Sequence, residues 1–201
     1  MKLNEVRIVG GAWRSRRIRF PDRAGLRPTP DRVRETVFNW LGQDLTGYAC
    51  LDLFAGSGAL GFEAASRGAA RVVMVESDRA AHAALRGNRD ALGARQVELV
   101  RADALEFVRG ARAASGQYDV IFADPPFSAD YWPRLIPLLP SRMAPDARVY
   151  CESSARLEWP ADWEVVKESR AGQVIFQLVK WTAHEPHGGL PGDVRPAHAR
   201  P

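Results

Sequence analysis

The stretch that decides the fold is Leu51-Asp52-Leu53-Phe54-Ala55-Gly56-Ser57-Gly58-Ala59-Leu60-Gly61. An apolar strand that ends in an acid and then breaks into glycines lets backbone N–H groups and a helix N-terminus approach a ligand closely. The three glycines also match the G-x-G-x-x-G dinucleotide fingerprint, and Glu76 follows about twenty residues after the first of them. The stretch therefore predicts a cofactor site and leaves the kind of cofactor open.

Acidic residues follow four successive apolar runs of the chain, at Asp52, Glu76, Asp103 and Asp124. Each run is short and rich in β-branched residues, and each is followed by a segment compatible with a helix, which predicts alternating strands and helices. Ligands of an open parallel sheet bind at the carboxyl ends of its strands, so the four acids gather along one edge. That edge suits a cationic sulfonium better than a dianionic pyrophosphate and favours S-adenosylmethionine over NAD. The simpler alternative is that Asp52 and Asp103 cap helices and Glu76 is solvated.

The tetrapeptide Asp124-Pro125-Pro126-Phe127 indicates the chemistry. The exocyclic amine of a base is a poor nucleophile because its lone pair is delocalised into the ring. A carboxylate and a carbonyl that accept its two N–H bonds favour attack on a methyl carbon, and Asp124 and the Pro125 carbonyl are the candidates. The two prolines make a stiff turn, and Phe127 can stack on a base. The alternative is a proline turn that ends a strand, with Phe127 in the core.

Two further segments complete a resemblance to a known family. They are Arg7-Ile8-Val9-Gly10-Gly11-Ala12-Trp13-Arg14 and Arg27-Pro28-Thr29-Pro30-Asp31-Arg32-Val33-Arg34-Glu35-Thr36-Val37-Phe38-Asn39-Trp40-Leu41. With the glycine loop and the Asp-Pro-Pro-Phe turn, they resemble the bacterial 16S ribosomal RNA guanine-N2 methyltransferase family known as RsmD, a family of class I S-adenosylmethionine-dependent methyltransferases. The resemblance implies an enzyme that transfers a methyl group from S-adenosylmethionine to the N2 amine of a specific guanine in 16S rRNA.

The same resemblance implies an α/β fold. We expect a Rossmann-like, seven-stranded and mostly parallel sheet of order 3-2-1-4-5-7-6, with a small N-terminal extension of a β-hairpin and a helix. Three regions follow, namely a basic RNA-binding module over 1–47, a methyltransferase domain over 48–181 and a disordered tail over 182–201. The fifth strand of the sheet is expected near 148–151, and a closing antiparallel pair over 163–168 and 174–180.

Within the N-terminal module we expect strands over 6–9 and 16–20 and then a helix. Thr29 can cap that helix and Pro30 suits its first position. Val33, Val37, Trp40 and Leu41 recur at helical spacing and should pack inward.

The N-terminal module is strongly basic. Residues 1–41 hold ten basic and four acidic side chains, a balance of +6 in a chain whose net charge is +4. Nine of the ten are arginines, which can fork onto phosphate or stack on bases, although a solvated arginine-rich face is the plainer explanation. Arg32 and Glu35 could equally form an ion pair within the helix. The candidate substrate contacts are Arg7, Gly10, Gly11, Trp13, Arg14, Arg27, Thr29, Arg32, Arg34 and Glu35.

The resemblance also implies roles at the cofactor. Asp52 should lie near the methionine amino group, and Gly56 and Gly58 should pass close to the cofactor backbone. Glu76 should bind both ribose hydroxyls, and Asp103 with the Ala104 N–H should hold the adenine edge. The remaining expected cofactor contacts are Phe54, Ser77 and Asp124.

Composition bounds the setting of the protein. The hydrophobic content of 46% supports one globular domain with a sizeable core. No apolar run is long enough to span a bilayer and the N-terminus leads into no signal-peptide core, so we expect a cytoplasmic protein. Cys50 and Cys151 should be small buried hydrophobes, and we expect no metal site. The expected partner is 16S rRNA within an assembled or assembling small ribosomal subunit, and the expected oligomeric state is a monomer.

Three alternatives compete with this reading. A DNA amino-methyltransferase shares the Asp-Pro-Pro-aromatic chemistry, but the chain shows no separate base-recognition domain. An NAD-dependent oxidoreductase fits the glycines and Glu76 but leaves Asp103, Asp124 and the basic module unexplained. A noncatalytic rRNA-binding assembly factor fits the charge alone.

Overall fold

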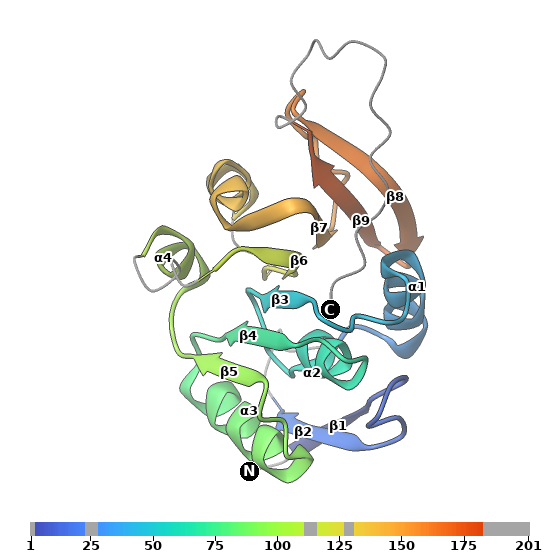
Figure 1. Ribbon diagram of the computed structural model, residues 1–201, viewed down its shortest axis with the longest axis vertical. Helices are drawn as coiled ribbons and strands as arrows, with labels where there is room; N and C mark the ends of the chain where they lie inside the picture. The colour runs from blue at the N-terminus through green and yellow to red at the C-terminus, as the bar shows by residue number, and fades with distance from the viewer. Residues whose placement is uncertain (1–2, 23–27, 111–115, 127–130, 183–201) are drawn as a thin grey trace.

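The central element of the protein is a seven-stranded sheet (Figure 1). The computed structural model describes residues 3–22, 28–110, 116–126 and 131–182. The strand order is β5-β4-β3-β6-β7-β9-β8, which is 3-2-1-4-5-7-6 when the strands are numbered within the sheet, so the predicted topology is confirmed. The strands are β3 (Ala49–Asp52), β4 (Arg71–Val75), β5 (Val97–Val100), β6 (Tyr118–Ala123), β7 (Met143–Ser153), β8 (Trp163–Ala171) and β9 (Val174–Trp181).

The first five strands of the sheet run parallel, and β9 lies antiparallel between β7 and β8. Helical segments connect the parallel strands, as they must when each crossover returns the chain to the same edge. These segments are α2 (Ala59–Ser66), α3 (Arg79–Leu92), α4 (Ala104–Arg109), α5 (Trp132–Leu135) and the 3-10 helix η2 (Ile136–Arg142). All parallel strands therefore end at one edge.

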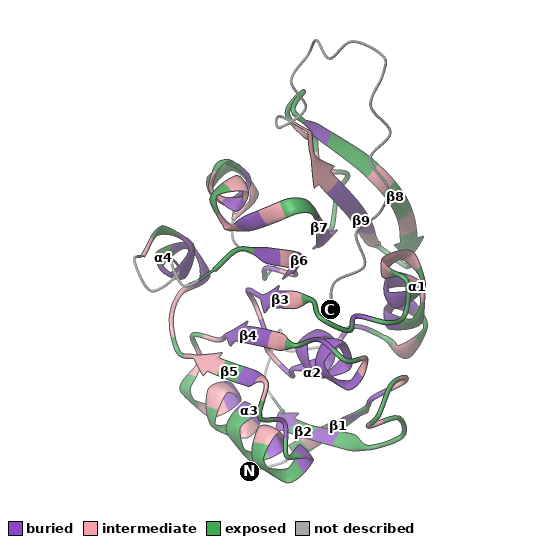
Figure 2. Ribbon diagram, in the orientation of Figure 1, coloured by how far each residue is buried: buried purple, intermediate pink, exposed green. Residues whose placement is uncertain are grey.

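The sheet separates two apolar clusters. Cys50 and Val72 belong to the cluster on the side of α1, α2 and α3, whereas Leu51 and Val73 belong to the cluster beneath α4 and η2. Successive side chains of a strand point to opposite faces, and here both faces are covered. The central strands β3, β4 and β6 are accordingly buried along most of their length, whereas the edge strand β8 is largely exposed (Figure 2). Cys50 is buried as predicted, and burial raises the pKa of its thiol.

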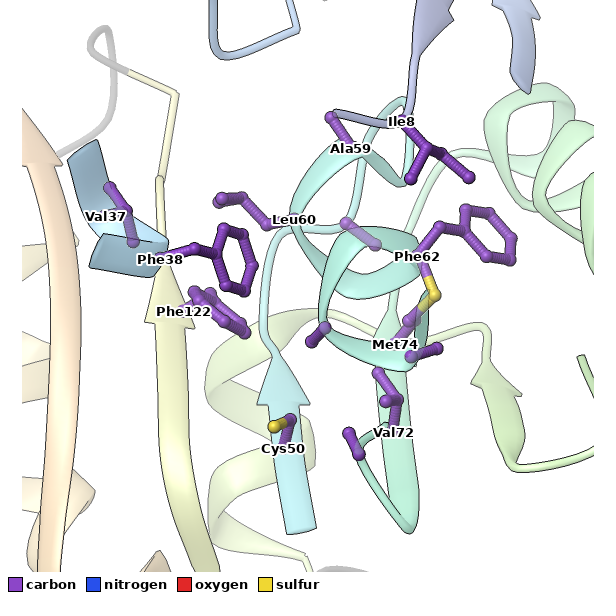
Figure 3. Packing of buried hydrophobic residues seen from close by; sticks show 14 of the residues in the cluster. Ile8, Val37, Phe38, Cys50, Ala59, Leu60, Phe62, Val72, Met74 and Phe122 are labelled. Atoms are coloured by element: carbon purple, nitrogen blue, oxygen red, sulfur yellow. The ribbon is translucent and has the colours of Figure 1, made fainter. Parts of the chain in front are cut away.

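The N-terminal hairpin consists of β1 (Leu3–Arg7) and β2 (Arg17–Pro21), paired antiparallel. The predicted hairpin is present, but β1 begins before residue 6 because Leu3–Glu5 also pair with β2. It ends before residue 9, where the loop closes through bonds between Ile8 and residues 15 and 16. The buried residues of the hairpin, Val6, Ile8, Ile18 and Phe20, join the same cluster as the sheet. Figure 3 shows Ile8 close to Phe62 of α2. The described part of the predicted module thus shares one core with the sheet.

Helix α1 (Asp31–Leu41) follows the hairpin, and its predicted capping by Thr29 is wrong. Pro30 occupies the N-cap position, with an extended backbone at φ −57° and ψ 149° and no side-chain cap. The Thr29 hydroxyl instead donates to Glu152 at 3.0 Å, on the neighbouring end of β7. A long-range partner has therefore taken the hydroxyl that the local sequence offers to the helix.

The inward face of α1 is as predicted. Val33 and Val37 are buried, and Trp40 packs on the core with its ring stacked 5.3 Å from that of Phe176. Phe38 lies against Phe122 of β6, with ring centroids 5.9 Å apart (Figure 3). Helix α1 is thereby fixed over the strand that carries Asp124.

Candidate active site

The glycine loop between β3 and α2 is built around Asp52. This residue ends β3 and is buried, and its Oδ2 accepts the Gly61 N–H at 3.0 Å. Gly58 has φ +84°, and a Cβ there would stand 2.7 Å from the side chains of Leu85 and Phe62, so both conformation and space require glycine. The loop therefore turns tightly and holds its backbone at the carboxyl end of β3.

Burial raises the pKa of Asp52 to about 7, and the nearby Glu76 charge adds to the rise, while N–H bonds from Gly61 and Phe54 oppose it. A buried carboxyl of this kind regains its charge when a cation binds beside it. Asp52 is therefore suited to a ligand that carries an ammonium group.

Glu76 joins the glycine loop to the next strand. Its Oε2 accepts the Gly56 N–H at 2.8 Å and its Oε1 accepts the Asp78 N–H at 2.7 Å. A carboxylate has about four acceptor positions, so each oxygen keeps capacity for a further donor such as a sugar hydroxyl. Ser77, which follows, is exposed.

Asp103 caps α4, so the capping alternative is confirmed for this residue. Its Oδ1 accepts the N–H groups of Leu105 at 2.9 Å and Glu106 at 3.1 Å. Its Oδ2 lies 3.4 Å from the hydroxyl of Tyr131, whose ring meets Phe54 edge-on at 5.0 Å. The adjacent Ala104 is buried.

Tyr131 was missed by the sequence reasoning. The available signal was an aromatic residue shortly after the Asp-Pro-Pro-Phe turn. With Phe54 it forms an aromatic wall beside Asp103.

Asp124 follows β6 at the same edge. Asp52 pairs in register with Phe122, so Asp124 lies two residues beyond Asp52 on the neighbouring strand. Burial raises the pKa of Asp124 well above its usual value, and the charges of Glu152 and Asp52 raise it further. Pro125 is buried and Pro126 is exposed, while Phe127 lies outside the described residues. The structure thus brings the acid of the turn close to the acid of the glycine loop.

The sequence reasoning also missed Glu152, which lies beside Asp124, and its partner Tyr150. Glu152 is buried near the end of β7, and its Oε1 accepts the hydroxyls of Tyr150 at 2.8 Å and Thr29 at 3.0 Å. Glu152 follows the apolar strand at 148–151, so the rule that selected the other four acids also selects this one.

Arg34 is a correction to the predicted RNA contacts. Its side chain is fully buried, with Nη1 3.1 Å from Oε2 of the equally buried Glu63. It also donates to the backbone oxygens of Thr29 at 3.1 Å and Arg7 at 2.7 Å. Arg34 therefore ties the hairpin and α1 to α2, and we do not propose it as an RNA contact.

Gly10 and Gly11 dock the hairpin loop on α2. A Cβ at Gly11, where φ is +73°, would lie 1.9 Å from the Ser66 carbonyl oxygen, and a Cβ at Gly10 would lie 2.2 Å from the Arg67 side chain. Trp13 donates its backbone N–H to the Ser66 hydroxyl at 2.8 Å, and its side chain packs on the core. The close approach of two backbones explains Gly11, and the Arg67 side chain occupies the space beside Gly10, so neither glycine requires a bound RNA.

The other predicted RNA contacts of the described chain lie at the surface. Arg14, Arg32 and Glu35 are exposed. Arg7 is exposed as well and pairs with Asp31 at 2.9 Å. Arg27 falls outside the described residues.

The fold and the site together define a class of protein. A parallel sheet closed by an antiparallel pair, with a glycine loop after its first strand and carboxylates at the strand ends, is a class I methyltransferase fold. The chain belongs to the family whose model is described as Conserved hypothetical protein 95, which matches residues 6–180.

Several proteins of known name resemble the chain. Ribosomal RNA small subunit methyltransferase D of Escherichia coli is 42% identical over 180 residues, which are 87% of this chain and 89% of that protein. The protein of the same name from Haemophilus influenzae is 39% identical and is covered over 93% of its length. A solved Escherichia coli structure described as the methyltransferase yhhF has a TM-score of 0.80 at 40% identity, covering 89% of this chain and 98% of that chain.

A more distant structure shares the fold. A solved structure described as the methyltransferase SMU.776 complexed with SAH superposes with a TM-score of 0.64 at 16% identity, over 81% of this chain and 53% of that chain. The predicted RsmD-type family, the enzyme class and the cofactor S-adenosylmethionine are thus confirmed, and an NAD-dependent oxidoreductase is not the class of this family.

Two absences hold for the described residues only. Within ranges 3–22, 28–110, 116–126 and 131–182, no group of three or more His, Cys, Asp or Glu side chains is placed to hold a metal ion. In the same part of the chain, no helix has the length and apolar character needed to cross a membrane.

Proposed function

We propose that the chain transfers the methyl group of S-adenosylmethionine to the N2 amine of one guanine in small-subunit ribosomal RNA. The observation that carries the proposal is the position of Asp124, held at the carboxyl end of β6 beside the Asp52 loop and followed by two prolines. The relatives named as small-subunit rRNA methyltransferases support the choice of RNA. We place the enzyme in the bacterial cytoplasm, as a monomer that acts on an assembled or assembling small subunit.

The cofactor is proposed to lie across the carboxyl ends of β3, β4 and β5. Asp52 pairs with its ammonium group, and Glu76 accepts its ribose hydroxyls while holding the Gly56 N–H. Asp103 and the Ala104 N–H face the adenine edge, with Phe54 against the ring. The loop glycines Gly56 and Gly58, the exposed Ser77 and the carboxyl of Asp124 complete the proposed contacts.

The transfer step needs acceptors for the two N–H bonds of the guanine amine. Asp124 and the Pro125 carbonyl are proposed to accept them, which returns electron density to N2 as it attacks the methyl carbon. The N2–methyl bond forms as the sulfur–methyl bond breaks, and that electron pair stays on sulfur. The surplus proton of N2 then passes to Asp124, and Phe127 is proposed to stack on the base.

RNA is proposed to approach over the N-terminal hairpin and α1. Exposed arginines there, Arg14 and Arg32, offer phosphate or base contacts, and Arg7 does so from its ion pair with Asp31. Trp13, Glu35, Arg27 and Thr29 complete the proposed substrate side. Thr29 is buried and is proposed to act indirectly, because its hydroxyl donates a hydrogen bond to Glu152, which lies beside Asp124.

The test is methyl transfer from labelled S-adenosylmethionine to undermethylated small subunits and to protein-free 16S rRNA, read by nucleoside mass spectrometry. We expect N2-methylguanosine from the wild type and from Asp90→Asn, a control at an exposed acid of α3, and none from Asp124→Ala. Label in DNA but in neither RNA would favour a DNA amino-methyltransferase instead. No label anywhere, with cofactor binding intact, would contradict the proposed substrate.

A further inference from the structure

Asp124 and Glu152 occupy matching places on adjacent parallel strands. Ala123 of β6 pairs in register with Cys151 of β7, so the next residue on each strand is an acid. In-register positions of parallel strands project to the same face of a sheet. Phe122 and Tyr150, two residues earlier on the two strands, indeed belong to one cluster with ring centroids 6.3 Å apart. The two carboxyl groups therefore share the face that α1 covers.

Glu152 is held in one orientation by hydroxyl groups. The Tyr150 hydroxyl donates from the same strand at 2.8 Å, and the Thr29 hydroxyl donates from the segment before α1 at 3.0 Å. Both bonds end on Oε1, so neither uses Oε2. Two hydroxyl groups that donate to one carboxyl oxygen favour the charged form of that carboxyl group.

The surroundings of Glu152 contain acids and neutral groups. Asp124 lies beside it at the end of β6, Asp52 of β3 acts on Asp124, and Tyr150 and Cys151 come from β7. Opposite it, β9 presents the apolar Phe176, and the segment before α1 presents the Thr29 hydroxyl. From α1, Arg34 reaches the Thr29 carbonyl oxygen and ion-pairs with Asp31 and Glu63.

These surroundings act on the two acids in the same direction. Burial raises the pKa of Glu152, while its two hydroxyl donors oppose the rise. Burial also raises the pKa of Asp124, and the charge of Glu152 is the next contribution. Two neighbouring buried carboxyl groups resist ionising together.

We propose that Glu152 is a positioning residue for methyl transfer, whose carboxylate, held charged beside Asp124, makes Asp124 a stronger acceptor for the proton of the guanine amine. The inference rests on the proposed function for its substrate. Glu152 acts through Asp124, which is the group that takes the proton of N2 when the N2–methyl bond has formed. The hydroxyls of Thr29 and Tyr150 favour the charged form of Glu152 by donating to its Oε1.

The first test is the pH dependence of transfer by Glu152→Gln, since glutamine keeps an oxygen for both hydroxyls but carries no charge. We expect the acidic limb of the kcat profile to move to lower pH by about one unit, because Asp124 loses a like-charged neighbour. We expect the plateau kcat to fall less than about tenfold, since the hydrogen bonds survive, and cofactor affinity to stay within about twofold.

Glu152→Leu is the matched contrast, because it removes the acceptor of both hydroxyls. We expect its plateau kcat to fall by at least about tenfold. Thr29→Val removes one hydroxyl that favours the charged form of Glu152, so it should move the acidic limb in the same direction by less than Glu152→Gln. An acidic limb that stays in place in both Glu152→Gln and Thr29→Val would make Glu152 purely structural. Loss of all transfer in Glu152→Gln with intact cofactor binding would mean that Glu152 does more than act through Asp124, which also overturns the proposal.

A second readout does not depend on turnover. Infrared difference spectra of the cofactor-free protein, titrated from about pH 5 to about pH 9, report protonated carboxyl groups. We expect a band near neutral pH that persists in Asp52→Asn and is lost in Glu152→Gln. That band in a wild type that methylates no RNA would refute the proposed function and leave the pair intact. A spectrum that is identical in wild type and Glu152→Gln would overturn the pair.

Discussion

The two ends of the carboxylate edge are built differently. At the cofactor end, Glu76 and Asp103 are held by backbone N–H groups of a loop and a helix N-terminus. At the transfer end, the half-buried Asp124 lies beside the buried Glu152, and Glu152 is held by two hydroxyls. Backbone donors orient a carboxylate and stabilise its charge, whereas burial beside another acid favours the protonated form.

The difference teaches how one row of acids can serve two purposes. The cofactor end offers fixed acceptors for hydroxyl and N–H groups, which is a binding task. The transfer end holds a proton that can be redistributed, which is a task in catalysis. Substitutions at the two ends should therefore affect different measurable quantities.

The largest effect is expected at the transfer end. Asp124→Ala should slow transfer by at least about a hundredfold, because one positioned acid–base group is lost. Cofactor affinity, measured by calorimetry, should remain within a few-fold of the wild type. Near-normal turnover in single-turnover assays would make Asp124 structural and erase the distinction between the two ends.

At the cofactor end, Glu76→Ala should weaken S-adenosylmethionine binding by at least about tenfold, since hydrogen bonds to a charged group contribute roughly 1.5–3 kcal/mol. At saturating cofactor the rate of transfer should change little. Calorimetry with Glu76→Ala and Asp90→Asn in parallel checks this. Unchanged affinity would show that Glu76 only anchors the loop through Gly56 and Asp78.

Asp52 lies between the two ends and predicts a pH dependence of stability. Its pKa is raised to about 7 in the folded chain, so the folded state keeps a proton that the unfolded state has released. The free energy of unfolding of the cofactor-free protein should therefore fall as pH rises from about 4 to about 7, by at least about 1 kcal/mol. Urea unfolding at several pH values across this range should show that the free energy of unfolding of Asp52→Asn changes less steeply with pH. An equal slope would mean that Asp52 does not carry the effect.

The smallest effect is expected at the aromatic wall. Tyr131→Phe loses one long hydrogen bond to Asp103, at 3.4 Å, and keeps the edge-on contact with Phe54. Cofactor affinity should fall less than about threefold, whereas Tyr131→Ala should cost more because the ring contact itself contributes about 0.5–1.5 kcal/mol. Equal losses in both variants would place the effect in the hydroxyl.

Much of the edge was predictable because its signals are local. The acids after apolar runs identify strand ends, and the glycines identify the loop, so Asp52, Glu76, Asp103 and Asp124 meet as expected. Glu152 follows the same rule after residues 148–151 and was overlooked there. Tyr131 has a weaker signal, since nothing in its sequence surroundings says that it turns toward Phe54.

The N-terminal module was less predictable. Arginines and glycines within a basic stretch read as RNA contacts, yet Arg34 is buried on Glu63, and Gly10 and Gly11 fit against the end of α2. Arg34 pairs with Asp31, three residues earlier, but its fully buried partner is Glu63, 29 residues further along the chain. A partner at that distance leaves no periodic mark near the arginine.

By itself, the sequence determined the row of acids and the family resemblance, and that resemblance implied the order of the strands, because strand periodicity, glycine conformation and short motifs are local properties. Only the tertiary structure decided which polar side chains are buried and which residues they hydrogen-bond there. The Thr29 hydroxyl binds Glu152 and does not cap α1, and the Arg34 side chain is buried against Glu63 and not exposed. The physical reason is that a buried charge or hydroxyl must find a partner wherever the packed chain supplies one, and packing joins residues that are remote in sequence.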